Sequence, residues 1–142
     1  MQCSTLMKTD VECCSVDQTV ESAARRMAER GIGFVPVCYG HGKVIGTLTD
    51  RDIVVRVIAK GLLASEVKVS DVFSREVVSC SPDDELSVAE ALMSKHKKSR
   101  IMCLDGDDTL VGVISLSDVA RVETGARSAA LLRSVAQREA RP

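Results

Sequence analysis

The sequence predicts an α+β fold with α/β-type layers, built from two tandem copies of one β-α-β-β-α unit and a C-terminal helix. Three observations lead to this prediction. The chain resembles itself at a spacing of 66 residues, the apolar positions in each copy change from helical spacing to short continuous runs, and the last helical segment has no counterpart. Because a unit of about 60 residues buries little core alone, we expect the copies to pack sheet against sheet with pseudo-two-fold symmetry, leaving clefts between them.

The repeat is visible without a gap when residues 4–53 are placed on residues 70–119. Ten of these fifty positions are identical, where ordinary composition would give about three by chance. The identities include Cys14/Cys80, Met27/Met93, Gly46/Gly112 and Asp52/Asp118. We therefore expect four parts: a first repeat (4–61), a linker (62–69), a second repeat (70–122) and a C-terminal helical extension (123–142).

Each copy is expected to pass through the same elements. An extended piece, DVECC or EVVSC, leads through a polar turn into a helix with apolar residues at helical spacing. In the second copy, SPDD resembles a helix entry with Ser81 as the cap and Pro82 in the first turn. Two apolar runs follow as strands, FVPVC and VIGTL in the first copy, IMCL and LVGVI in the second. DRDIVVRVIAKG then forms a second helix that ends at Gly61.

The last segment, VETGARSAALLRSVAQREARP, has helical apolar spacing and no equivalent in the first copy. We expect an extra helix that either lies on the core or mediates self-association.

Composition excludes several classes of function. A net charge of -1 and a pI near 6.1 leave no basic surface for nucleic acid or anionic lipid. MQCSTLMKTD lacks the features of a signal peptide, and no apolar run approaches the ~20 residues of a membrane span, so we expect a cytoplasmic protein.

The six cysteines have no C-x-x-C spacing. In a reducing compartment we expect most of them to be small apolar core residues. A zinc or redox site is the alternative, and it applies most to Cys13 and Cys14. Asp50 and Asp52 offer too few ligands for a metal site, and Asp50 corresponds to Leu116 in the second copy. We therefore expect no metal site.

One short motif occurs at the same place in both copies, as GTLTDRD (Gly46, Thr49, Asp52) and as GVISLSD (Gly112, Ser115, Asp118). With the preceding TVESAARRMAERGIGFVPV, it resembles the CBS domain, named after cystathionine beta-synthase. The tandem arrangement resembles the CBS pair, or Bateman module, over about residues 4–122. The resemblance implies adenosine-containing ligands in the clefts between copies: AMP, ADP or ATP first, NAD or S-adenosylmethionine as alternatives. It also implies a homodimer.

The chemistry of the motif agrees with such ligands. An Asp at the start of a helix can accept hydrogen bonds from both ribose hydroxyls, and its charge is favoured at the helix N-terminus. A Ser or Thr hydroxyl three residues earlier, together with the free amides of that helix start, can hold a phosphate.

By resemblance, the second copy carries the better site. Arg100 would meet phosphate oxygens with a planar, permanently charged group, whereas Ser99 stands where the family has a histidine. The other phosphate, ribose and adenine contacts are expected from Val113, Ser115, Ser117 and Asp118 of the second copy and from Ile32, Gly33, Glu12 and Cys13 of the first.

The site of the first copy is expected to be weaker, because Phe34 stands where the second copy has Arg100. Arg51 could substitute for the missing cation. The residues expected here are Thr49, Arg51 and Asp52, with adenine contacts from Val78, Lys98 and Ser99 of the second copy.

The sequence shows no combination of nucleophile, base and orienting residue. We therefore expect a non-catalytic regulatory module that senses an adenine nucleotide and signals through a dimer or an unidentified protein partner. Two alternatives stay open: a cysteine-based redox or metal sensor, and a structural dimerisation module with degenerate sites.

Overall fold

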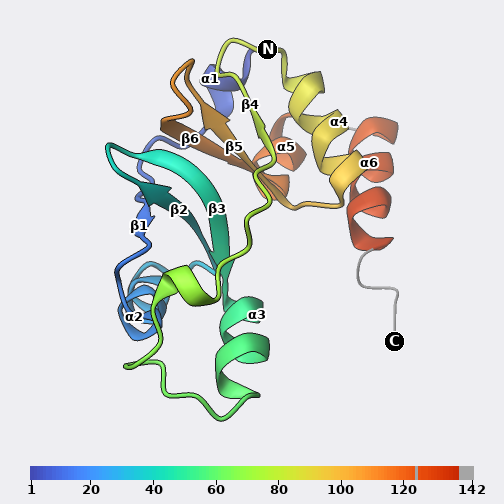
Figure 1. Cartoon of the computed structure of the whole chain (residues 1–142). Helices are drawn as coiled ribbons and strands as arrows, with labels where there is room; N and C mark the ends of the chain where they lie inside the picture. Colours follow the sequence, from blue (N-terminus) through green and yellow to red (C-terminus); the bar gives the residue numbers. More distant parts are fainter. Residues whose placement is uncertain (124, 138–142) are drawn as a thin grey trace. The chain divides into compact units, whose positions relative to one another are not determined.

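The computed structural model describes residues 1–123 and 125–137 and has mixed helices and strands in two three-stranded sheets (Figure 1). The α+β class and the tandem organisation are confirmed. Thr124 and residues 138–142, part of the expected C-terminal extension, lie outside the described residues. The chain divides into two compact units: unit 1 contains Met1–Val11 and the chain from Val78 onward, and unit 2 is Glu12–Val77.

Unit 2 contains the elements of the first copy. They are β1 (Cys14–Ser15), α2 (Val20–Arg30), β2 (Phe34–Tyr39), β3 (Lys43–Thr49), α3 (Asp50–Ile53), the π-helical turn η1 (Val54–Ile58) and the short 3₁₀ helix η2 (Val69–Asp71). β1 is parallel to β2, and β3 is antiparallel to it. α2 begins where the Thr19 side chain accepts a hydrogen bond from the amide of Ser22 at 3.1 Å, and it ends at Gly31, whose φ is 63°. Gly supplies this left-handed conformation without strain.

Unit 1 contains the second copy. Its elements are α1 (Cys3–Leu6), β4 (Ser79–Cys80), α4 (Leu86–His96), β5 (Arg100–Leu104), β6 (Leu110–Ser115), α5 (Leu116–Val122) and α6 (Ala126–Ala136). α6, the expected extra helix, lies against α4 and buries Leu131 and Val135 in the core of this unit (Figure 1). The hydroxyls of Ser94 and Ser134 join the two helices at 2.6 Å.

The spacing of 66 residues recurs in the hydrogen-bonded geometry. Phe34 pairs with Thr49 across β2 and β3, and Arg100 pairs with Ser115 across β5 and β6. The register shift after Val37 recurs after Cys103. α2 and α4 have the same length and occupy equivalent positions. Both copies therefore place the end of the last strand and the start of the following helix in the same local setting.

The leading segment of each repeat packs in the unit formed by the other copy. α1 and Met7 belong to unit 1, where the amide and carbonyl of Lys8 bond to Val113 at 2.9 and 3.0 Å. The equivalent η2 and Phe73 belong to unit 2, where Ser74 bonds in the same way to Thr47. The compact units therefore do not coincide with the sequence repeats.

Two local expectations were wrong in detail. Ser81 does not cap α4, which begins at Leu86 after the N-cap residue Glu85. Ser81 instead closes a turn, because the Asp84 carboxylate accepts its amide at 2.9 Å and its hydroxyl accepts the amide of Asp83 at 3.2 Å. The helix expected over DRDIVVRVIAKG widens into η1 after Ile53, although Gly61 has the left-handed φ of 69° expected at its end. In the described part of the chain, no helix combines the length and the apolar character that crossing a membrane requires.

Candidate functional site

Two helix entries carry the repeated motif, and both have the same closed hydrogen-bond geometry. In the first corner (Thr49–Asp52), the Thr49 hydroxyl accepts the amide of Asp52 at 3.1 Å, and the Asp52 carboxylate accepts the amide of Thr49 at 3.0 Å. In the second corner (Ser115–Asp118), the equivalent distances are 3.2 and 2.9 Å. Each corner is a capping box, which satisfies two helix-start amides reciprocally. The motif therefore has a structural role in each unit.

The loop before β2 lies directly against the first corner. The amide of Asp50 donates to the carbonyl of Gly33 at 3.0 Å, and a Cβ on Gly33 would stand 2.5 Å from the Asp50 carboxylate. A larger residue at position 33 would therefore force the Asp50 side chain to move. Asp50 also accepts the amide of Arg51 at 2.9 Å. Of the residues expected at the two ligand sites, unit 2 brings together Gly33, Thr49, Arg51 and Asp52.

The second corner has the equivalent loop contact and a different set of polar groups. The amide of Leu116 donates to the carbonyl of Ser99 at 2.7 Å. The hydroxyls of Ser115 and Ser117 lie 2.9 Å apart. Arg100 is the direct strand partner of Ser115 in the antiparallel pair. Unit 1 therefore brings Ser99, Arg100, Ser115, Ser117 and Asp118 to one corner.

The carboxylates of the two corners differ in burial and in charge. The Asp118 side chain is 4% exposed, and its Oδ1 lies 3.4 Å from the ammonium of Lys8 and 3.5 Å from the guanidinium of Arg121. Burial alone would raise the pKa of Asp118, but hydrogen bonds from Ser115 and the charge of Lys8 hold it below its ordinary value. The Asp52 side chain is 14% exposed, and its Oδ1 lies 3.9 Å from the guanidinium of Arg56.

Lys8 is a residue of the second corner that sequence reasoning missed. The shift of 66 residues places Lys8 on Ser74, so the leading segment was part of the detected repeat. The shift did not reveal that this segment packs against the other copy, where its backbone pairs with Val113, one of the residues expected at the ligand site. As a result, the second corner gains a cation where the first has a serine.

The other expected site residues lie in separate local settings. Ile32 is 36% exposed at the end of α2. The carbonyl of Val78 accepts the amide of Met102 at 3.3 Å, and the amide of Lys98 donates to the carbonyl of Met93. Glu12 lies 3.6 Å from Arg26. Each expected ligand site draws on residues of both units, and that assembly stays a prediction.

The cysteines divide into two kinds. Cys3, Cys14, Cys80 and Cys103 are buried free thiols, as the sequence predicted for most of them. Burial raises the pKa of Cys3 to about 12 and also raises that of Cys14. The hydrogen bond with Cys103, together with burial, raises the pKa of Cys80. Cys13 and Cys38 are joined by a disulfide; Cys38 is buried in the core as expected, whereas Cys13 is partly exposed, so the core expectation was wrong for Cys13. Within residues 1–123 and 125–137, no three His, Cys, Asp or Glu side chains are arranged to hold a metal ion.

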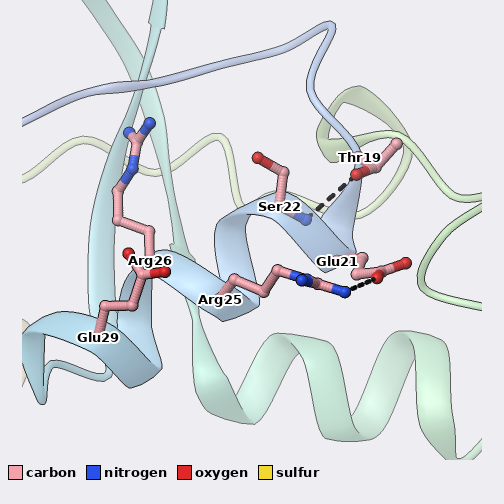
Figure 2. A pocket seen from close by; sticks show the side chains of 6 residues that line it. All are labelled: Thr19, Glu21, Ser22, Arg25, Arg26 and Glu29. Atoms are coloured by element: carbon pink, nitrogen blue, oxygen red, sulfur yellow. Dashed lines mark hydrogen bonds and ion pairs between the residues drawn. The ribbon is translucent and has the colours of Figure 1, made fainter.

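A polar groove of about 380 Å³ runs along α2, and its lining includes no residue of the repeated motif (Figure 2). All its lining residues come from this helix and its cap: Thr19, Glu21, Ser22, Arg25, Arg26 and Glu29. Arg25 and Glu21 pair at 2.7 Å, whereas Arg26 extends away from that pair (Figure 2). The two acidic and two basic side chains balance, so the groove offers no net charge to a ligand.

Comparisons with known proteins agree with the repeat. The family model described as "CBS domain" matches residues 3–59 and 69–125. The CBS domain-containing protein YhcV of Bacillus subtilis is 39% identical over 114 residues, covering 80% of this chain and 79% of that protein. A conserved CBS domain protein of unknown function from Thermoplasma acidophilum has a TM-score of 0.81 at 23% identity, covering 94% of this chain and 75% of that one.

A further solved structure is the CBS domain pair of protein MJ0100 in complex with 5'-methylthioadenosine and S-adenosyl-L-methionine. It has a TM-score of 0.76 at 20% identity, and the match covers 86% of this chain and 94% of that one. At this identity the likeness is one of fold. With two family matches in register with the internal repeat, the chain belongs to the CBS domain family and carries two CBS domains in tandem.

Proposed function

We propose that this CBS pair is a non-catalytic regulatory module that binds an adenosine-containing ligand, with AMP, ADP or ATP as the first candidates. The observation that carries the proposal is the second corner, where Arg100, Ser115, Ser117 and Asp118 meet at one helix start. A guanidinium suits phosphate oxygens, and the hydroxyls and helix-start amides supply further donors. Phosphate and sugar recognition would thus come from one short turn and its neighbouring strand.

Lys8 adds a further cation to this corner, beside Arg100 and Arg121. Its side chain is 61% exposed, and its ammonium lies at the one carboxylate oxygen of Asp118 that the capping box does not use. A ribose hydroxyl that donates to this oxygen takes the place of Lys8, and the ammonium turns to the phosphate. The swap conserves charge pairing, because the phosphate supplies a new anion for the displaced cation.

The first corner offers a more accessible carboxylate but a poorer phosphate environment. Asp52 is less buried than Asp118, and Phe34 occupies the strand position that Arg100 has in the second copy. Ser74 takes the place of Lys8. Arg51, in the first turn of α3, is the nearest replacement cation in the sequence. We infer that this corner binds ligands with less charge, and that it binds AMP more weakly than the second corner does.

The adenine is proposed to lie between the two copies, as expected from the sequence. For the second corner it would contact Ile32, Gly33, Glu12 and Cys13. For the first corner it would contact Val78, Lys98 and Ser99. The CBS pair of MJ0100, which shares the fold, holds two adenosyl compounds and supports this ligand class. Occupancy is proposed to act through a homodimer or a regulated protein, by favouring one arrangement over another.

Isothermal titration calorimetry of the full chain with AMP, ADP, ATP, NAD and S-adenosylmethionine tests the proposal. We expect heat from at least one ligand and competition among those that bind. Inorganic phosphate and adenosine, titrated separately, show which end of the ligand is recognised. Failure of every adenosyl ligand to bind folded protein would refute the proposed function.

A further inference from the structure

The Cys13–Cys38 disulfide is the cysteine pair of this chain that the repeat does not explain. The residues equivalent to Cys13 and Cys38 in the second copy are Ser79 and Leu104, so the bond belongs to the first copy alone. Its two cysteines are 25 positions apart, and the loop it closes contains α2 and the Gly31–Gly33 turn. The bond fastens the residue before β1 to the next-to-last residue of β2.

The disulfide holds a segment that few other contacts hold. β1 has only two residues, and its ladder to β2 consists of the pairs Cys14–Val37 and Ser15–Cys38. Immediately before it, the chain passes from unit 1 into unit 2 between Val11 and Glu12. Further contacts of Glu12 and Cys13 come from α2. Arg26 donates to the carbonyl of Cys13 at 2.9 Å, and Arg26 and Arg30 lie 3.6 and 3.7 Å from the Glu12 carboxylate.

The two sulfurs differ in access, and the other thiols are shielded. Cys13 is partly exposed, whereas Cys38 is 6% exposed within β2. The four free cysteines are all buried. Thiol–disulfide exchange begins with attack on an accessible sulfur, so a dithiol reaches this disulfide through Cys13. The cationic groups of Arg26 and Arg30 beside this segment favour a thiolate at Cys13 once the bond is open.

We propose that Cys13 and Cys38 form a reversible redox site, opened by a dithiol, and that its state controls the order of the Glu12–Cys13 segment. A thiolate of the dithiol attacks the Cys13 sulfur, the S–S bond breaks, and Cys38 leaves as a thiolate that takes up a proton. The second thiol of the reagent attacks the mixed disulfide and releases Cys13. The protein disulfide gains two electrons and two protons, and the dithiol becomes a disulfide.

A consequence for ligand binding follows, and it rests on the proposed function. Glu12 and Cys13 are two of the residues proposed to contact adenine at the second corner. When the bond is open, the segment loses its covalent tie to β2 and keeps its contacts with β1, Arg26 and Arg30, and ordering it on binding has an added entropic cost. We expect reduction to weaken AMP binding by about tenfold, within the usual range of coupling between sites.

Three measurements on the full chain test the proposal. After treatment with dithiothreitol, alkylation of the folded protein followed by mass spectrometry should label Cys13, whereas the four buried free thiols, as internal controls, and the buried Cys38 should react only after denaturation. Hydrogen exchange at residues 12–15 should rise on reduction, whereas the equivalent residues 78–81 of the second copy should not change. Calorimetry should show weaker AMP binding by reduced protein. The C13S/C38S variant should bind AMP as weakly as reduced protein does, and the dithiol should not change its affinity.

Each result bears on a separate part of the inference. If the disulfide opens only when the buried thiols also become labelled, the bond is structural and the proposal is overturned. Equal exchange at residues 12–15 in both states also overturns it. Equal AMP affinity in the two states refutes the coupling to ligand. If neither state binds AMP, the proposed function fails, while labelling and hydrogen exchange still decide the redox site. Because labelling and hydrogen exchange use the wild-type chain, the redox site can be tested even if C13S/C38S does not fold.

Discussion

The ammonium of Lys8 lies 3.4 Å from Oδ1 of Asp118, so the beginning of the chain supplies a cation to the helix entry of the second copy. The contact is fixed by the backbone, because Lys8 pairs with Val113 in both hydrogen-bonding directions. The equivalent backbone pairing in unit 2 brings Ser74 to Thr47. The leading segment therefore adds one charge to the differences between the two corners.

Lys8→Ala should weaken AMP binding by about tenfold, because a charge-assisted contact contributes about 1.5 kcal/mol. Adenosine, which has no phosphate, should lose little affinity. Calorimetry with both ligands measures the difference, and Lys60→Ala, which removes an exposed lysine at the end of the α3–η1 segment, is the matched control. Equal losses for AMP and adenosine would show that Lys8 does not contact the phosphate.

Asp118→Ala should weaken AMP binding more than Asp52→Ala, because Arg100 and Lys8 serve only the second corner. Both variants lose a capping box, which costs about 1 kcal/mol of stability. The pair therefore controls for the structural effect of the substitution. Binding is compared by calorimetry on samples whose folded fraction is measured by circular dichroism. Equal weakening by the two substitutions would contradict the inequality of the sites.

The contribution of Asp118 to stability should depend on pH in a defined window. Its pKa in the folded protein lies below the ordinary value of 3.8. The stabilisation is therefore complete above that value and is lost as the pH falls through the lowered folded pKa. Asp118→Asn should reduce the free energy of unfolding at neutral pH and flatten its decrease in acid. Urea denaturation between pH 2 and pH 7 measures both; a wild-type acid slope retained in Asp118→Asn would assign that slope to other groups.

Gly46→Ala should destabilise the protein more than the equivalent Gly112→Ala. A Cβ on Gly46 would lie 2.1 Å from the backbone carbonyl of Ser74, which is fixed by its pairing with Thr47. A Cβ on Gly112 would meet the Met7 side chain at 2.6 Å, and a methionine can turn away. Overpacking costs about 1–3 kcal/mol, and we expect the upper end for Gly46 and the lower for Gly112. Thermal unfolding of the two variants compares them, and the reverse order would contradict this packing argument.

The sequence predicts most of what depends on local chemistry or on repetition. Thr49 with Asp52 and Ser115 with Asp118 are recognisable because each pair is three residues apart and occurs twice. Ser81 shows the limit of a local prediction. Its hydroxyl suits a cap, but Asp84 offers a competing partner that closes a turn before the helix begins. A single residue in the same turn thus decided the outcome.

Contacts between distant segments were beyond the sequence argument. Lys8 reaches Asp118 only because the leading segment pairs with β6, and no spacing pattern reveals that pairing. Cys13 reaches Cys38 because β1 and β2 are parallel in a particular register, which places Ser15 opposite Cys38. Both contacts follow from tertiary packing. A lysine at position 8 or a cysteine at position 13 does not by itself indicate such a contact in the sequence.

The leading segments also decide how this chain could be divided. A fragment cut at the repeat boundary would keep its own leading segment but lose the leading segment of the other repeat, which packs in its core. Cys3, from the start of the chain, lies in the core of unit 1. Val69, Val72 and Phe73, from the start of the second repeat, lie in the core of unit 2. Residues 12–77 contain every part of one compact unit, whereas the first repeat alone does not. A protein with a single copy of this repeat would have to borrow the missing segment from a second chain, so duplication within one gene removes a dependence on concentration.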